Sequence, residues 1–206
     1  MLLEWKTKLS SLPLSTSTKN LTIQYIKSTF KFAHEYYDTK NISIVLTPIK
    51  NKENKQEMQV LSLEEFNLFI AKVEHPIFKA FYETLYFTGM RRGEAIALLK
   101  NDLQDETISI NKSVRRITEG VKTTKTQSSI RKVKINKTLA NTLKNLQKNA
   151  GVYLFGDNEP LRPTTIRRQF DKAIKLSGVK KIRLHDLRHS HATLLINNNV
   201  NIVALH

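Results

Sequence analysis

Apolar residues in the first part of the chain recur with the period of an α-helix. Residues 20–37 suit an amphipathic helix, whereas residues 47–60 are polar and almost free of large apolar groups until their end. Such a composition is typical of a linker between domains. A helix over 20–37 would bring these residues near one side: Leu21, Tyr25, Ile26, Phe30 and Phe32/Ala33. The pattern therefore predicts helical structure ahead of a linker.

Two further helices and a break are predicted after the linker. Ser62 and Glu65 have the spacing of a capping box, in which each side chain accepts the other residue's backbone N–H. The apolar stripe that follows consists of Leu63, Phe66, Phe69, Ile70 and Val73. Pro76 suits the first turn of a second helix over 76–88, with these residues inward: Phe78, Phe81, Tyr82 and Leu85. Gly89 interrupts this helix, and a short helix resumes after it.

From residue 106 the apolar pattern changes from helical to alternating. Three short runs, 107–110, 112–117 and 131–135, predict strands, and the third has one apolar and one basic face. Helices are predicted again over 137–148 and 164–176, and a last one starts near His185. Strands do not alternate with helices, so a doubly wound parallel sheet is disfavoured. The predicted class is mainly α with a small antiparallel sheet (α+β).

The distribution of charge points to a polyanionic partner. The net charge of the 206 residues is +16, and residues 111–138 and 161–192 carry +8 and +7 of it. Two concentrated basic blocks suit nucleic acid better than two unrelated solvated faces. RNA is disfavoured relative to duplex DNA because the chain has no aromatic RNA-binding motif.

Composition also excludes several kinds of chemistry and location. The chain has no cysteine, which removes disulfides, thiolate zinc sites and thiol catalysis. It has no apolar run long enough to span a membrane and no secretory signal at its start. These features fit a cytoplasmic protein.

The densest candidate chemistry lies in residues 183–195, RLHDLRHSHATLL. A metal site, a solvated charged face and a phosphate site all fit such a cluster. Metal is disfavoured, because Arg188 would repel a cation and no further ligands stand out. A buried neutral structural role suits His189 or His191. For His185 and Arg188, three residues apart, phosphate binding and proton transfer are the favoured interpretation.

Two other stretches supply groups of the same kind. Arg91 follows the Gly89 break next to a helix start, where backbone N–H groups can also face an anion. Lys125 lies in a connection rich in Thr, Ser and Lys between two predicted strands, and could bring an ammonium group to a phosphate backbone.

These three stretches resemble the motifs of the tyrosine recombinases of the phage-integrase type. TGMRRGEAIALLKNDL is similar to the box with the first catalytic arginine, hence Arg91, and its supporting acid, hence Glu94. TKTQSSIRKVKI resembles the hairpin of the catalytic lysine, hence Lys125. LHDLRHSHATLL resembles the His-x-x-Arg box, hence His185 and Arg188. The resemblance runs from about residue 60 to the end.

The resemblance implies a domain organisation. Residues 1–46 would be part of a helical core-binding domain that binds DNA, 47–60 the linker, and 61–206 a catalytic domain truncated at its C-terminus. The family's third box and tyrosine nucleophile follow the His-x-x-Arg box, whereas all six tyrosines here precede His185. We therefore expect a fragment that binds DNA but does not cleave it.

The resemblance also implies an activity: site-specific recombination, in which phage or other mobile-element DNA is integrated or excised through a 3′-phosphotyrosyl intermediate. Arg91 and Arg188 would bind the phosphate, and Lys125 would protonate the leaving oxygen. His185 would assist the removal of the tyrosine's proton or hold the phosphate. No cofactor or metal is expected. The alternatives are a host recombinase that resolves chromosome dimers and a non-catalytic DNA-binding module of the same fold.

The expected partners are double-stranded DNA attachment sites and, for the full-length protein, three further copies in a tetramer on DNA, in the cytoplasm of a bacterial host cell. We expect further basic residues to contact DNA: Arg92, Arg115, Arg116, Arg131, Lys132, Arg167, Arg168, Lys172 and Arg183.

Overall fold

The computed structural model describes residues 1–50, 58–114, 120, 122–123 and 130–198. The chain divides into two compact units, Met1–Gln56 and Glu57–His206. Each unit has its own hydrophobic core, and we describe each by itself. Lys125, Arg115 and Arg116 lie outside the described residues, so their predicted roles stay predictions.

The first unit consists of two helices and a short 3-10 turn. Helix α1 spans Leu2–Ser11, α2 spans Thr16–Tyr37, and the turn η1 spans Ile42–Val45. The side chain of Ser15 accepts the backbone N–H of Thr18 and so caps α2. The small core is made by Leu9, Ile23 and Leu46.

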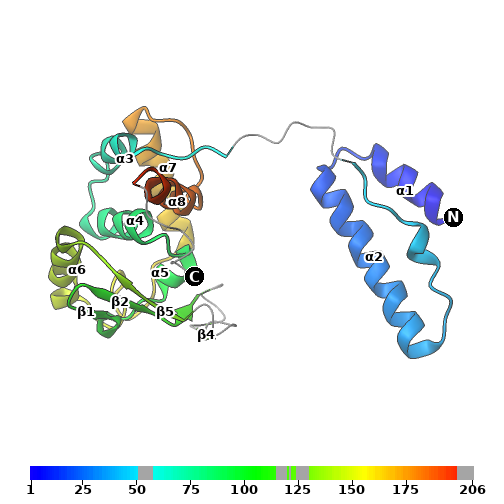
Figure 1. Ribbon diagram of the computed structural model, residues 1–206, viewed down its shortest axis with the longest axis horizontal. Coiled ribbons are helices and arrows are strands. Elements are labelled where there is room, and N and C mark those ends of the chain that lie inside the picture. Colours follow the sequence, from blue (N-terminus) through cyan, green and yellow to red (C-terminus); the bar gives the residue numbers. More distant parts are fainter. Residues whose placement is uncertain (51–57, 115–119, 121, 124–129, 199–206) are drawn as a thin grey trace. The chain divides into compact units, whose positions relative to one another are not determined.

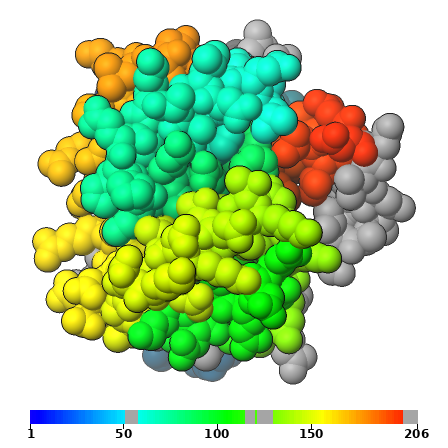
Figure 2. Space-filling view, turned by 90° about the vertical axis from the view of Figure 1, so that its left-hand side faces the viewer, coloured from blue at the N-terminus to red at the C-terminus, as the bar shows by residue number. Residues whose placement is uncertain are grey.

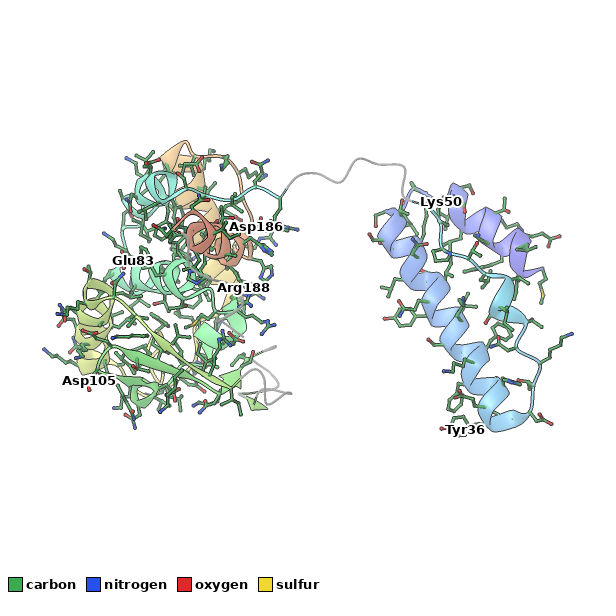
Figure 3. The ribbon with its side chains drawn as sticks, viewed as in Figure 1. Tyr36, Lys50, Glu83, Asp105, Asp186 and Arg188 are labelled. Carbon is green, nitrogen blue, oxygen red and sulfur yellow. The ribbon has the colours of Figure 1, made fainter. Side chains whose placement is uncertain are left out.

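The helix predicted over 20–37 is confirmed, but its apolar residues do not share one face. Ile23 is buried, and Ile26 packs against the same small core. Leu21, Tyr25 and Phe32, which the sequence pattern placed near one side with Ile26, are exposed. The prediction of one apolar side is wrong because these residues and Ile23 lie on opposite faces of the helix. Figure 3 labels Tyr36, at the end of the same exposed stripe.

The second unit begins with the helices that the sequence predicted. Helix α3 spans Leu63–Ile70, α4 spans Pro76–Thr88 and α5 spans Arg92–Ile96. The capping box is confirmed: the Glu65 N–H donates to the Ser62 hydroxyl, and the Ser62 N–H donates to the Glu65 carboxylate. Gly89 ends α4 in the left-handed region, at φ 60°, where glycine is favoured.

A small antiparallel sheet follows the turn η2 (Lys100–Asp102). It contains β1 (Leu103–Gln104), β2 (Thr107–Ile110) and β5 (Arg131–Lys134), in the order β1-β2-β5. Ile108 lies opposite Val133, and Ile110 lies opposite Arg131. A separate two-stranded ladder pairs β3 (Lys112–Ser113) with β4 (Lys122–Thr123). Within the described residues, the strand predicted over 112–117 is limited to β3, and β1 was not predicted.

Three more helices follow in the described part of the second unit: α6 (Lys137–Asn149), α7 (Pro163–Ser177) and α8 (Asp186–Asn197). Helix α4 lies in the middle, with α3, α7 and α8 on one side and α6 and the sheet on the other (Figure 1). Figure 2 shows α3 and α4, in cyan to blue-green, above α6 in yellow-green, with α8 in red at one edge. The fold is mainly α with a small antiparallel sheet, as predicted.

Helix α4 supplies much of the core because its aromatic rings contact several neighbours. Tyr86 stacks on Phe66 of α3 with ring centroids 3.8 Å apart, and Tyr82 packs against Phe170 of α7. The Tyr82 hydroxyl donates to the Ile166 carbonyl at 2.7 Å. Buried aromatic groups with a satisfied hydroxyl stabilise a core strongly, so α4 joins α3 and α7 into one body.

Leu61, the first buried residue that the structure describes in the second unit, is attached to α8. The Leu61 N–H donates to the Ser190 hydroxyl at 2.9 Å, and that hydroxyl donates to the Asp186 carbonyl at 2.8 Å. Leu61 and Ser190 are both buried.

In the part of the chain that the structure describes, none of the helices has the length and apolar character of a membrane-spanning segment.

We expect Ser190→Ala to destabilise the protein by about 1–3 kcal/mol, because it leaves the buried Leu61 N–H without its acceptor. Chemical denaturation measures the change. Thr193→Ala is the matched control, since the Thr193 hydroxyl also donates to a carbonyl one turn back, that of His189. Equal losses from the two substitutions would show that the Leu61 contact contributes nothing.

Candidate active site

The site is organised around the turn between α4 and α5. Gly89 ends α4, Met90 is buried, and Arg91 immediately precedes α5 in an extended conformation. The Arg91 side chain is 57% exposed. An arginine at this position can therefore present its guanidinium to solvent beside the N–H groups that begin a helix.

The buried carboxylate of Glu94 binds both the backbone and the side chain of Arg91. Its side chain is only 2% exposed, and Oε2 accepts the Arg91 backbone N–H at 2.8 Å while Oε1 accepts Arg91 Nη1 at 3.1 Å. Burial acts to raise the pKa of the Glu94 carboxyl, but the hydrogen bonds and charges of Arg131 and Arg91 outweigh it and hold this pKa below its ordinary value. Glu94 is therefore a buried carboxylate, neutralised by arginines.

Arg131, the first residue of β5, is the second partner of Glu94. Its Nη2 donates to Oε2 at 2.8 Å and its Nη1 donates to Oε1 at 3.4 Å, so the guanidinium spans both oxygens. The side chain is 27% exposed. Side chains alternate between the two faces of a strand, so Arg131 lies on the same, less exposed face as Val133 and Ile135. Lys132 and Lys134 lie on the other face and are exposed.

Arg188 reaches the same turn from α8. Its Nη1 donates to the carbonyl of Gly89, and Figure 3 shows it on α8 near Asp186. Burial lowers the pKa of Arg188, and the positive charges of Arg91 and Arg131 lower it further. Arg188 is held at the Gly89 turn, and Arg91 and Arg131 are both held by Glu94 of the helix that follows this turn. They form, with Glu94, what we call the arginine centre: Arg91, Glu94, Arg131 and Arg188.

His191 holds α8 against the turn. Its Nδ1 lies 2.9 Å from the Tyr86 carbonyl, which can only accept, so Nδ1 carries the proton. A methyl group added at Gly89 would lie 2.5 Å from His191 Cδ2. Burial lowers the pKa of His191, although the Tyr86 contact acts in the opposite direction. The neutral structural histidine that the sequence suggested for His189 or His191 is thus His191.

His185 immediately precedes α8 and is exposed. Its ring lies perpendicular to that of His189, with centroids 5.2 Å apart. Partial burial, followed by the charges of His189 and Arg188, lowers the pKa of His185. A neutral imidazole can accept a proton, which is what the predicted role requires.

Asp186 anchors the start of α8 and was not singled out from the sequence. It is buried, and its carboxylate accepts the Arg183 backbone N–H at 2.7 Å and Arg183 Nη2 at 2.9 Å. Burial acts to raise the pKa of Asp186, and the Arg183 contacts outweigh it, so the net shift is downward. An acid in the first turn, three residues after an arginine, is the signal that could have indicated this contact.

Gly93 brings β3 against α5. The Val114 N–H donates to the Gly93 carbonyl at 2.9 Å. A methyl group at Gly93 would lie 2.7 Å from the Val114 carbonyl oxygen and 2.8 Å from Ser113 Oγ. Glycine is needed here for close approach rather than for an unusual backbone angle.

A basic cleft of about 750 Å³ is lined by Arg92, the residue after Arg91, and by His185, three residues before Arg188. Its lining includes a set of basic side chains from α5, α7 and the segment before α8: Arg92, Arg167, Lys175, Lys181, Arg183 and His185. Arg167 also lies 3.6 Å from Asp171. Three residues predicted to contact DNA, Arg92, Arg167 and Arg183, therefore share one concave surface.

Other predicted DNA contacts lie elsewhere. Arg168 and Lys172 are one turn apart on α7 and do not line the cleft, and Lys172 pairs with Glu74 at 3.3 Å. Lys132 projects from the sheet face opposite to Arg131. Contacts of these residues with DNA stay predictions. In the described part of the chain, no group of three or more His, Asp or Glu side chains could hold a metal ion.

Fold and site together define a class of protein. The model of the phage integrase family matches residues 49–206, and the chain belongs to this family of tyrosine recombinases. The chain is 31% identical over 172 residues to the ICEBs1 integrase of Bacillus subtilis, covering 73% of this chain and 46% of that integrase. It is 27% identical over 222 residues to the integrase of Staphylococcus phage L54a, covering 88% and 63%. The chain thus spans about half the length of these relatives.

Solved structures share the fold. The Tn1549 transposon integrase in complex with a circular intermediate DNA superposes with a TM-score of 0.80 at 21% identity, covering 98% of this chain and 73% of that one. A lambda integrase tetramer bound to a Holliday junction gives a TM-score of 0.68 at 19% identity, covering 93% and 57%.

We expect Gly89→Ala to destabilise the protein by about 1–3 kcal/mol, because alanine is strained in the left-handed region and its methyl group would push His191 away. Chemical denaturation measures the loss. Gly178→Ala is the matched control: Gly178 also has a positive φ, but nothing lies within 4 Å of an added methyl group. If both variants lose the same stability, the His191 contact is not the cause.

His191 should make the protein less stable in acid. Its pKa in the folded chain lies below the ordinary value, so the unfolded chain binds the proton first and the free energy of unfolding falls as the pH drops below about 6.5. We expect His191→Asn to reduce this fall in urea titrations between about pH 7.5 and about pH 5. His185 shifts in the same direction and supplies part of the remainder. An unchanged pH dependence in the variant would contradict the assignment.

Proposed function

We propose that this chain is the DNA-binding and phosphate-activating part of a site-specific recombinase that integrates or excises mobile-element DNA. The observation that carries the proposal is the convergence of Arg91 and Arg188 on the Gly89 turn, with Glu94 holding Arg91. Two guanidiniums held at one turn, close enough for the charge of Arg91 to act on Arg188, would offer donors to the non-bridging oxygens of one phosphodiester.

In the proposed reaction a tyrosine oxygen attacks the phosphorus and the bond to the 5′ oxygen breaks, leaving a 3′-phosphotyrosyl link. Arg91 and Arg188 stabilise the charge that develops on the phosphate oxygens. His185, neutral near pH 7, accepts the tyrosine proton, and Lys125 donates a proton to the leaving oxygen. A 5′ hydroxyl of the partner strand reverses these steps, so no external energy source is needed.

The proposed DNA contact surface extends from the arginine centre into the basic cleft. Arg92, Arg167 and Arg183 would follow the backbone on either side of the bound phosphate. Residues 1–46 would act as part of a helical core-binding domain that also binds DNA. The full-length protein would act as a tetramer on DNA in the bacterial cytoplasm, and the lambda integrase tetramer on a Holliday junction supports this arrangement.

A mobile-element origin is favoured because the ICEBs1 and phage L54a integrases are among the relatives. A host recombinase that resolves chromosome dimers would use the same arginine centre. A non-catalytic DNA-binding module would bind DNA equally well. Recombination by the full-length protein would distinguish a recombinase from such a module.

We propose further that these 206 residues bind DNA without cleaving it. All six tyrosines precede His185. Burial raises the pKa of Tyr86 to about 12 and also raises that of Tyr82, so neither is a suitable nucleophile. The nucleophile of the proposed reaction follows the His-x-x-Arg box, as in the family.

We expect the chain to bind duplex DNA and Arg91→Gln to weaken this binding by about tenfold, since a charge-assisted phosphate contact contributes about 1.5–3 kcal/mol. The slope of the logarithm of the binding constant against the logarithm of the salt concentration should decrease in magnitude by about one. Fluorescence anisotropy at several salt concentrations measures both. Lys148→Gln, an equal loss of charge on the exposed side of α6, is the control. Equal effects of the two substitutions would contradict a phosphate site at Arg91.

We expect no covalent protein–DNA adduct from these 206 residues on a nicked duplex that traps the phosphotyrosyl intermediate. Denaturing gels followed by mass spectrometry of the DNA-bound fraction measure this. An adduct on any of the six tyrosines would contradict the proposed absence of a nucleophile, and the modified peptide would identify the residue.

A further inference from the structure

We propose that Arg131 is a positioning residue of the proposed active site. Its guanidinium holds the Glu94 carboxylate, and Glu94 in turn holds Arg91 in the orientation that meets the phosphate. The inference rests on the proposed function and deepens it, because it assigns a task to a residue that charge alone would place among the DNA contacts.

The first argument is the division of hydrogen bonds at Glu94. Arg131 occupies both carboxylate oxygens with its two terminal nitrogens, whereas the Arg91 guanidinium uses only Nη1, at 3.1 Å. Within the described part of the chain, the other side-chain donors of Arg91 do not bind Glu94, and 57% of the side chain is exposed. Arg131 is less exposed, at 27%. The geometry thus satisfies Glu94 with one arginine and leaves the other available.

The second argument is electrostatic. Glu94 is 2% exposed, and a buried carboxylate is costly unless it is paired. Without Arg131, Arg91 would be the remaining arginine partner of Glu94 among the contacts described here, and the attraction would draw its guanidinium toward the carboxylate. A bidentate contact is what arginine provides and lysine does not.

The third argument is that Arg131 is itself well placed. It lies opposite Ile110 in the β2–β5 ladder and begins a strand whose Val133 and Ile135 face inward. On the other side, the Val114 N–H binds the Gly93 carbonyl. Gly93 and Glu94, adjacent residues of α5, are therefore bound to Val114, immediately after β3, and to Arg131, the first residue of β5.

A double-mutant cycle on DNA binding tests the inference. We expect Arg131→Gln to weaken duplex binding by about fivefold in the unaltered chain but by less than about twofold when Arg91→Gln is already present, since the effect passes through Arg91. Arg131→Lys should recover part of the loss. Lys134→Gln, an equal charge loss on the exposed face of the same strand, is the matched control and should change affinity by less than about twofold. Independent, multiplying effects of Arg131→Gln and Arg91→Gln would overturn the proposal and make Arg131 a direct phosphate contact.

A second measurement needs no DNA. Carbon-13 NMR titration of the Glu94 carboxyl should show a higher pKa in Arg131→Gln than in the unaltered chain, and no change in Lys134→Gln. The Nε signal of Arg91 should shift in the same Arg131 variant. Unchanged Glu94 and Arg91 signals would overturn the proposal. If the unaltered chain binds no duplex, the proposed function fails, and these signals still decide the role of Arg131. If Arg131→Gln does not fold, Arg131→Lys takes its place in both experiments.

Discussion

The arginine centre depends on one buried carboxylate. Burial and the positive charges of Arg91 and Arg131 lower the pKa of Arg188, and Glu94 is the acid that binds Arg91 and Arg131 directly. Its burial makes each of these contacts stronger than it would be in water. One carboxylate does not neutralise three guanidiniums, so the arginine centre keeps a net positive charge. Attraction for a phosphate is therefore retained while the repulsion between neighbours is reduced.

The rest of the second unit serves to bring distant segments to this carboxylate. Helix α4 forms the middle of the core and ends at Gly89, where the chain must turn sharply to start α5. Helix α8 closes on that turn through Arg188 and His191, about a hundred residues later in the sequence. The sheet adds Arg131 from a third direction. Because these contacts use backbone carbonyls as well as side chains, the geometry of the turn and of the arginines is set together.

Local patterns predicted the elements well, since capping boxes, a proline at a helix start and strand alternation depend on neighbouring residues. The Ser62–Glu65 box and the helix Pro76–Thr88 are observed as predicted. What the patterns missed depends on tertiary contact. Alternation marked 131–135 as half basic, but only the structure joins Arg131 to Glu94. Residues 20–37 form a helix, yet Leu21 and Tyr25 are exposed because the small core lies on the opposite face.

The attachment of Leu61 to Ser190 gives the second unit a mechanical property. Ser190 lies two residues after Arg188 on the same helix, and its hydroxyl accepts the backbone N–H of Leu61. Tension transmitted along residues 58–61 would thus be applied to α8 close to the arginine centre, with one hydrogen bond and two residues of helix between them. A displacement of the backbone at Leu61 would in this way act, over a very short path, on the helix whose Arg188 contacts the Gly89 turn.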